Sequence, residues 1–183
     1  MVTYYERRLP HWHPPGMDIF ITWRLHGSLP VQVRPPAETD SSGKAFVSYD
    51  RALDEAHTGP LWLKNPLIAE TLLSALREAQ RRKLCELRAY AVMANHVHVL
   101  LAPRTPLKRI TLQIKGASAH EANLILGRTG APFWQKESFD HWVRNPGEWQ
   151  KIRAYIERNP VAAWPLSRKT GRGPARPIRL CSA

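Results

Sequence analysis

Two histidines, His96 and His98, are separated by one valine in a run that is typical of a β-strand, residues 95–101. Successive side chains of a strand point to opposite faces, so both imidazoles project from one face. Neutral imidazole binds divalent metal ions, and two of them on a stiff strand make half of a metal site. A half-exposed sheet face that carries two histidines by chance would show the same spacing.

Tyr155 and Asn159 stand four residues apart in the last helical segment, so they share one line along its surface. Ile152 and Ile156 follow helical spacing and should face the core, which puts that line on the flank of the apolar face. A phenol and an amide could there meet the open face of a sheet. A tyrosine that only packs its ring, beside an asparagine that only ends the helix, would give the same pattern.

The elements that would position these residues alternate between strand and helix patterns. Runs rich in β-branched and aromatic residues predict strands, and apolar residues at helical spacing after Asn-Pro pairs predict helices. In chain order the sequence predicts a strand at 18–25, helices at 50–57 and 66–83, a hairpin of strands at 85–93 and 96–102, a helix at 106–127, a strand at 139–144 and a helix at 146–159.

This order fits an α/β (α+β) class: a ferredoxin-like sandwich with a largely antiparallel four-stranded sheet and helices packed on one face. Residues 1–16 are basic, aromatic and proline-rich, which predicts an extended N-terminal arm. The folded domain is expected at 17–166. The basic, Gly- and Pro-containing segment 167–183 is expected to be a flexible tail.

The composition points to a packed, basic protein. Hydrophobic residues make up 43% of the 183 residues, which is enough for a core, and the formal charge of +12 favours a polyanionic partner. Binding to the ribosome or to a membrane surface would explain the same charge. Cys85 and Cys181 lack CxxC spacing, which excludes a disulfide scaffold and a cysteine zinc site and agrees with a reducing cytoplasm. No apolar run approaches the ~20 residues that span a bilayer, and no signal peptide is expected.

Five segments resemble, in the same order, the signatures of REP-associated tyrosine transposases. They are YYERRLPHW at 4–12, ITWRLHGSLP at 21–30, VMANHVHVLL at 92–101, FWQKESFDHWVR at 133–144 and AYIERNPV at 154–161. Together the resemblance spans about residues 4–165. This family is part of the HUH superfamily of single-strand endonucleases, whose two histidines flank one hydrophobic residue.

The resemblance implies a function and a site. His96, His98 and Asn159 would bind a divalent metal ion, Mg or Mn, and Tyr155 would be the nucleophile. The reaction would be metal-dependent nicking and strand transfer of single-stranded DNA at hairpin repeats, through a 5′-phosphotyrosine. Residues 17–166 would be the HUH transposase domain, acting as a monomer or homodimer in the cytoplasm, at the bacterial nucleoid.

Side chains expected to contact DNA are basic or aromatic, although each one alone could be an ordinary solvated or packed group. They are Arg7, Arg8, Trp12, Lys115, Arg144, Lys151 and Arg158. The chain departs from the family pattern at Ala94, where proline is usual, at Phe139, where many members have tyrosine, and over 161–166. These departures leave the expected nucleophile in place.

Two other functions fit parts of the pattern. A domesticated, non-catalytic protein that binds single-stranded or hairpin nucleic acid would need the charge but not His96, His98, Tyr155 and Asn159 together. A metal-dependent hydrolase would use water as its nucleophile, and the sequence offers no obvious carboxylate base near the histidines.

Overall fold

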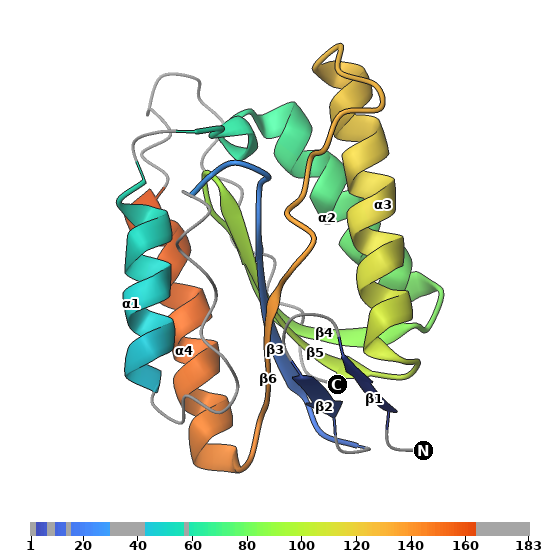
Figure 1. Ribbon diagram of the computed structural model, residues 1–183. Coiled ribbons are helices and arrows are strands. Elements are labelled where there is room, and N and C mark those ends of the chain that lie inside the picture. The colour runs from blue at the N-terminus through green and yellow to red at the C-terminus, as the bar shows by residue number, and fades with distance from the viewer. Residues whose placement is uncertain (1–2, 7–9, 14–15, 30–42, 57–58, 164–183) are drawn as a thin grey trace, which may run out of the picture.

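A computed structural model describes residues 3–6, 10–13, 16–29, 43–56 and 59–163. Four antiparallel strands form its central sheet in the order β4-β5-β3-β6 (Figure 1). Their bounds are Ile19–Arg24 for β3, Cys85–Val92 for β4, His96–Pro103 for β5 and Phe139–Trp142 for β6. The expected α/β class, the four-stranded sheet and the order of its elements are confirmed.

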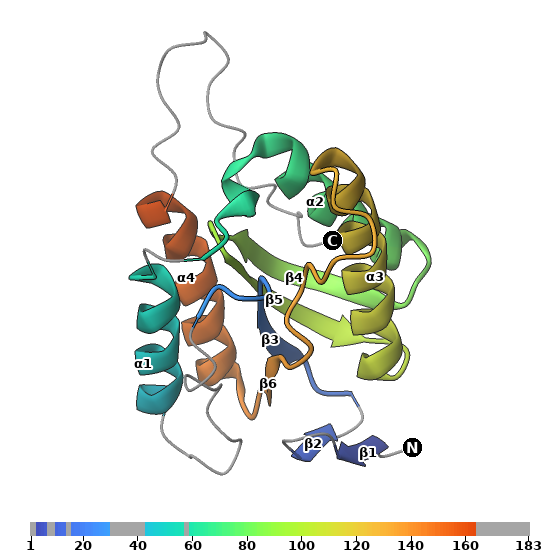
Figure 2. The same cartoon turned by 45° about the horizontal axis from the view of Figure 1, so that its top comes forward.

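Helices cover both faces of this sheet, whereas the sequence predicted them on one face. The helices α2 (Pro66–Arg81) and α3 (Leu107–Ile125) lie on one side, and α1 (Gly43–Asp54) and α4 (Pro146–Ala163) lie on the other (Figures 1 and 2). The physical reason lies in the inner strands. All six residues of β3 and the first six of β5 are buried, and a strand buried on both faces needs a covering layer on each side.

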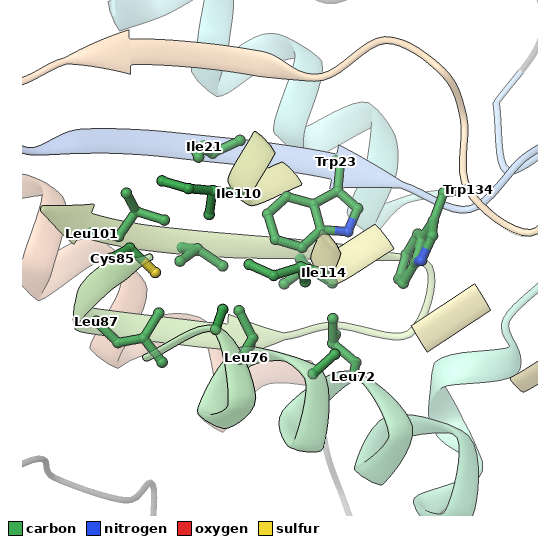
Figure 3. Packing of buried hydrophobic residues seen from close by; sticks show 14 of the residues in the cluster. Ile21, Trp23, Leu72, Leu76, Cys85, Leu87, Leu101, Ile110, Ile114 and Trp134 are labelled. Carbon is green, nitrogen blue, oxygen red and sulfur yellow. The ribbon is translucent and has the colours of Figure 1, made fainter. Parts of the chain in front are cut away.

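The face under α2 and α3 carries the larger apolar core. Ile21, Trp23 and Leu101 of the sheet pack there against Leu76 and Ile110 of the two helices (Figure 3). The Asn65 side chain caps α2 by accepting a hydrogen bond from the backbone N–H of Leu67 at 3.0 Å. The cap and the apolar core together hold α2 and α3 against this face of the sheet.

A bulge between Leu87 and Ala89 changes which residues of β4 face each layer. Before it Cys85 and Leu87 join the core under α2 and α3. After it Ala89 and Ala91 join the cluster under α1 and α4. The extra residue in the bulged strand causes this exchange, since side-chain direction otherwise alternates strictly.

Helix α1 begins earlier than predicted, at Gly43 rather than at Asp50, and ends at Asp54 rather than at residue 57. Phe46, Tyr49 and Leu53 recur at helical spacing and contact the sheet face or the small cluster beside it. Tertiary packing therefore overrides the weak helix propensity of the aromatic residues.

Short elements complete the described part of the chain. Strands β1 (Thr3–Glu6) and β2 (Pro10–His13) pair antiparallel within the expected extended arm, and η1 (Trp62–Lys64) is a 3-10 turn before α2. The expected tail, 167–183, lies outside the described residues. Within the described residues, no helix has the length and apolar character to cross a bilayer.

Candidate active site

His96 and His98 lie on β5 and point to the face covered by α1 and α4, as their spacing predicts. Both are fully buried, and their Nε2 atoms are 3.1 Å apart. The neighbouring strands place Thr22 and Ala91 on either side of His98. Ala91 presents only a methyl group beside His98.

Each imidazole is held through its Nδ1 atom. His96 Nδ1 lies 2.7 Å from Asn95 Oδ1, and His98 Nδ1 lies 2.8 Å from Thr22 Oγ1. The Asn95 amide also donates from Nδ2 to the Leu53 carbonyl at 2.8 Å, so its oxygen must face His96. His96 therefore donates from Nδ1 and keeps the Nε2 lone pair free, and Thr22 can accept from His98 in the same way.

A carboxylate that sequence reasoning missed completes this cluster. Asp50 of α1 is 1% exposed, and its Oδ1 lies 3.4 Å from His96 Nε2 and 3.3 Å from His98 Nε2. This Oδ1 atom is buried without a hydrogen-bond partner. Asp54, one turn further on α1, is half-exposed and lies 3.9 Å from His96. The expectation that no carboxylate lies near the histidines is therefore wrong.

The protonation states of His96 and Asp50 favour binding of a cation. Burial lowers the pKa of His96 to about 4, so its ring is neutral at pH 7 and can act as a ligand. Burial alone would raise the pKa of Asp50, but the adjacent imidazoles of His96 and His98 lower it by more. The site thus presents the Asp50 carboxylate and the neutral His96 imidazole in the forms that bind metals.

The three atoms fit a divalent ion by their spacing and chemistry. His96 Nε2, His98 Nε2 and Asp50 Oδ1 form a triangle with edges of 3.1, 3.4 and 3.3 Å. Neighbouring ligands of an octahedral ion with bonds of about 2.1 Å are about 3 Å apart, so such a triangle matches one face. Three converging lone pairs, one on an orphaned buried oxygen, are what a bound cation would satisfy.

Tyr155 of α4 reaches the same cluster. Its hydroxyl donates a hydrogen bond to Asp50 Oδ2, and its ring centroid lies 5.6 Å from that of His98. Phe46 also packs against the Tyr155 ring, with the two centroids 6.0 Å apart. The structure thus brings Tyr155 and both histidines to one carboxylate.

Asn159 lies one turn beyond Tyr155 on α4 and is half-buried. Its Nδ2 atom is buried without a hydrogen-bond partner. Unlike Tyr155, Asn159 has no described hydrogen bond or ion pair to the histidines or to Asp50. Its side chain is nevertheless on the helix line that Tyr155 occupies.

The residues expected to bind DNA differ in their surroundings. Lys151 and Arg158 are exposed on α4, next to Tyr155, and the Arg144 guanidinium lies 5.7 Å from the centre of the Trp142 ring. Lys115 is engaged within the protein, since its Nζ donates to the carbonyls of residues 135 and 136 at 2.6 and 3.1 Å. The side chains of Arg7, Arg8 and Trp12 lie outside the described residues.

Comparison with known proteins gives a family match. A family model described as "Transposase IS200 like" matches residues 61–159. No curated protein matches the chain.

Two solved structures are similar to the chain. One, described as a REP-associated tyrosine transposase bound to a REP hairpin, shares 16% identity at a TM-score of 0.46 and covers 87% of this chain and 73% of that one. The other is a putative transposase from Deinococcus radiodurans R1, with 19% identity and a TM-score of 0.44, covering 81% of this chain and 93% of that one.

Proposed function

Since the chain belongs to the family of IS200-like transposases, we propose that it nicks and rejoins single-stranded DNA through Tyr155. The family match confirms the resemblance found in the sequence at the level of transposase. The observation that carries the finer proposal is the meeting of the Tyr155 hydroxyl, Asp50 and the paired histidines on one sheet face.

In the proposed step the Tyr155 oxygen attacks the phosphorus of a DNA phosphodiester. A bond from Tyr155 Oη to phosphorus forms, the bond to the 3′ oxygen breaks, and a 5′-phosphotyrosine remains. The phenol proton leaves to solvent, and the departing 3′ oxygen takes up a proton. Because the phosphotyrosine is still a phosphodiester, a 3′-hydroxyl can reverse the step and join a new strand without ATP.

His96 and His98 are the proposed ligands of a divalent ion, Mg or Mn, and Asn159 is proposed beside them. When bound, such an ion would neutralise charge on the phosphate oxygens. The protein's own part is to hold both Nε2 atoms toward one point and to keep the Tyr155 hydroxyl oriented by Asp50.

The proposed partner is single-stranded DNA that carries hairpin repeats. The formal charge of +12 and the exposed Lys151 and Arg158 beside Tyr155 support binding to a phosphate backbone. The hairpin itself is proposed from the resemblance of the sequence signatures.

The replacement Tyr155→Phe tests the nucleophile. We expect a single-stranded oligonucleotide labelled at its 3′ end to form a covalent adduct with the native chain in Mn, visible on a denaturing gel. The Phe variant lacks the attacking oxygen, so it should form no adduct while it still binds the oligonucleotide. Tyr90→Phe, on the opposite face of the sheet, is the matched control and should react normally. An adduct in the Tyr155 variant would refute the assignment.

Asp50 gives a specific reason to test a second function, hydrolysis by an activated water. A buried carboxylate beside two imidazoles is a common setting for such chemistry. Hydrolysis would release cut DNA without an adduct and would survive Tyr155→Phe. Binding without cleavage by the native chain would instead indicate a non-catalytic, domesticated protein.

A further inference from the structure

We infer that Asp50 is a protein ligand of the divalent ion, so that α1 completes the metal site from outside the family-matched region. This inference rests on the metal dependence proposed above. The match begins at residue 61, whereas α1 ends at Asp54. The region common to the family thus supplies the histidines and the tyrosine, and the segment before it supplies the charged oxygen.

The first argument is the state of the Asp50 oxygens. Oδ2 accepts the hydrogen bond from Tyr155, but Oδ1 has no hydrogen-bond partner although it is buried. A buried carboxylate oxygen without a partner is costly, and a cation between it and the two Nε2 atoms would satisfy it.

The second argument is the support given to α1 at this position. Asn95 links the two halves of the site, because its oxygen holds His96 while its nitrogen donates to the Leu53 carbonyl of α1. Leu53 is 1% exposed and packs with Tyr49, the residue before Asp50. The carboxylate is therefore held by a buried hydrogen bond and by packing, which is how ligands are normally positioned.

The third argument is ligand chemistry. Mg and Mn favour carboxylate oxygens, and two neutral imidazoles with one amide would leave the ion's charge uncompensated. Asp50 supplies one negative charge and keeps Oδ2 for Tyr155. Asn159 can still take a further coordination position, since such ions accept six ligands.

Calorimetric titration of the full metal-free chain with Mn, without DNA, tests the inference. Loss of groups that merely orient a ligand weakens metal binding by about 10- to 100-fold, so Asp50→Asn should weaken it by about 100-fold or more. Glu55→Gln is the matched control, because it removes the same charge from an exposed position just after the end of α1 and should bind Mn like the native chain. Asn159→Ala should lose less affinity than Asp50→Asn.

A second variant tests whether residue 50 ligates the metal by a gained signal, and does not depend on a loss of Mn affinity. Asp50→Cys replaces a hard oxygen by a soft sulfur, so the site should now prefer Cd and show thiolate-to-cadmium absorption in the ultraviolet. Both chains should carry Cys181→Ser, which removes the second thiol of the sequence. The chain without the Asp50 change should then lack this absorption, because Cys85 is buried in the opposite core. Absence of the new absorption in the variant would count against direct ligation.

The outcomes separate this inference from the proposed function. Mn affinity of Asp50→Asn within threefold of the native value would overturn the role of Asp50, while adduct formation through Tyr155 could stand. A native chain that binds no Mn would overturn the metal site as a whole, Asp50 included. Normal Mn binding without any adduct would overturn the nicking proposal and leave the ligand assignment intact.

Discussion

The two faces of the central sheet are built from the same strands but differ in what they bury. The face under α2 and α3 is an apolar core around Ile21, Leu101 and Ile110. The face under α1 and α4 buries Asp50, His96 and His98 beside a smaller apolar cluster. Because buried polar groups are costly unless satisfied, the second face gains little stability from its centre. The first face stabilises the fold, whereas the second gives up stability for the buried polar cluster that we propose as the active site.

The largest effect on stability is expected from a truncation in the apolar core under α2 and α3. Leu76→Ala removes a fully buried side chain of α2, and such truncations lower the free energy of unfolding by about 2–5 kcal/mol. Urea denaturation would measure this loss, while Mn affinity should stay unchanged. Leu67→Ala, at a position that is 66% exposed, should be nearly neutral. A large change of Mn affinity in Leu76→Ala would show that the two faces are energetically coupled.

Thr22→Val, on the other face, should have the opposite effect: it should lower Mn affinity and leave stability nearly unchanged. This change removes the hydroxyl that lies 2.8 Å from His98 Nδ1 and leaves the strand and its packing in place. Metal affinity should fall by about 10- to 100-fold, as for other groups that orient a ligating histidine, with little loss of stability. Thr71→Val on α2, whose hydroxyl bonds the Ile68 carbonyl, serves as the control. Unaltered Mn binding in Thr22→Val would mean that His98 needs no such support.

The smallest effect should come from the edge of the second face, at Glu148. Burial would raise the pKa of Glu148, but the Arg144 backbone N–H and the His141 ring lower it by more. Its carboxylate also lies in the first turn of α4, where negative charge is favourable. Glu148→Gln should therefore cost about 0.5–1 kcal/mol at pH 7.

The pH dependence of that cost has a defined sign. A carboxyl whose pKa is lowered by folding stabilises above its unfolded value, 4.5, and loses this contribution as the pH falls through the folded value. Urea unfolding at pH 7 and at an acid pH below the folded pKa would measure it, and the difference between native chain and variant should vanish at the lower pH. A difference that persists in acid would point to packing in place of charge.

Much of the fold follows from local pattern. The alternation of β5 places His96 and His98 on one face, and Asn65 and Asn145 mark the helix starts they were expected to mark. The sequence could not show that helices cover both faces, because strand order and layer depend on contacts far apart in the chain. It also could not locate the bulge in β4, which depends on pairing with β5.

Local periodicity also predicted part of the site. The positions of Tyr155 and the histidines follow from helix and strand periodicity, whereas Asp50 meets them only through the packing of α1 over the sheet. One signal was available: Phe46, Asp50 and Leu53 share a helical face, so an acidic residue was present within an apolar stripe. A carboxylate in that position is rare without a partner.

The bulge in β4 gives one strand two alternating patterns in opposite phase. In its first half the odd-numbered residues Cys85 and Leu87 face the apolar core under α2 and α3. In its second half the odd-numbered residues Ala89 and Ala91 face the side that carries the two histidines. A regular strand of this sequence would turn Tyr90 and Val92 toward the histidines and put bulk above them. A single extra residue in β4 thus places small alanines, in place of Tyr90 and Val92, on the face that carries His96 and His98.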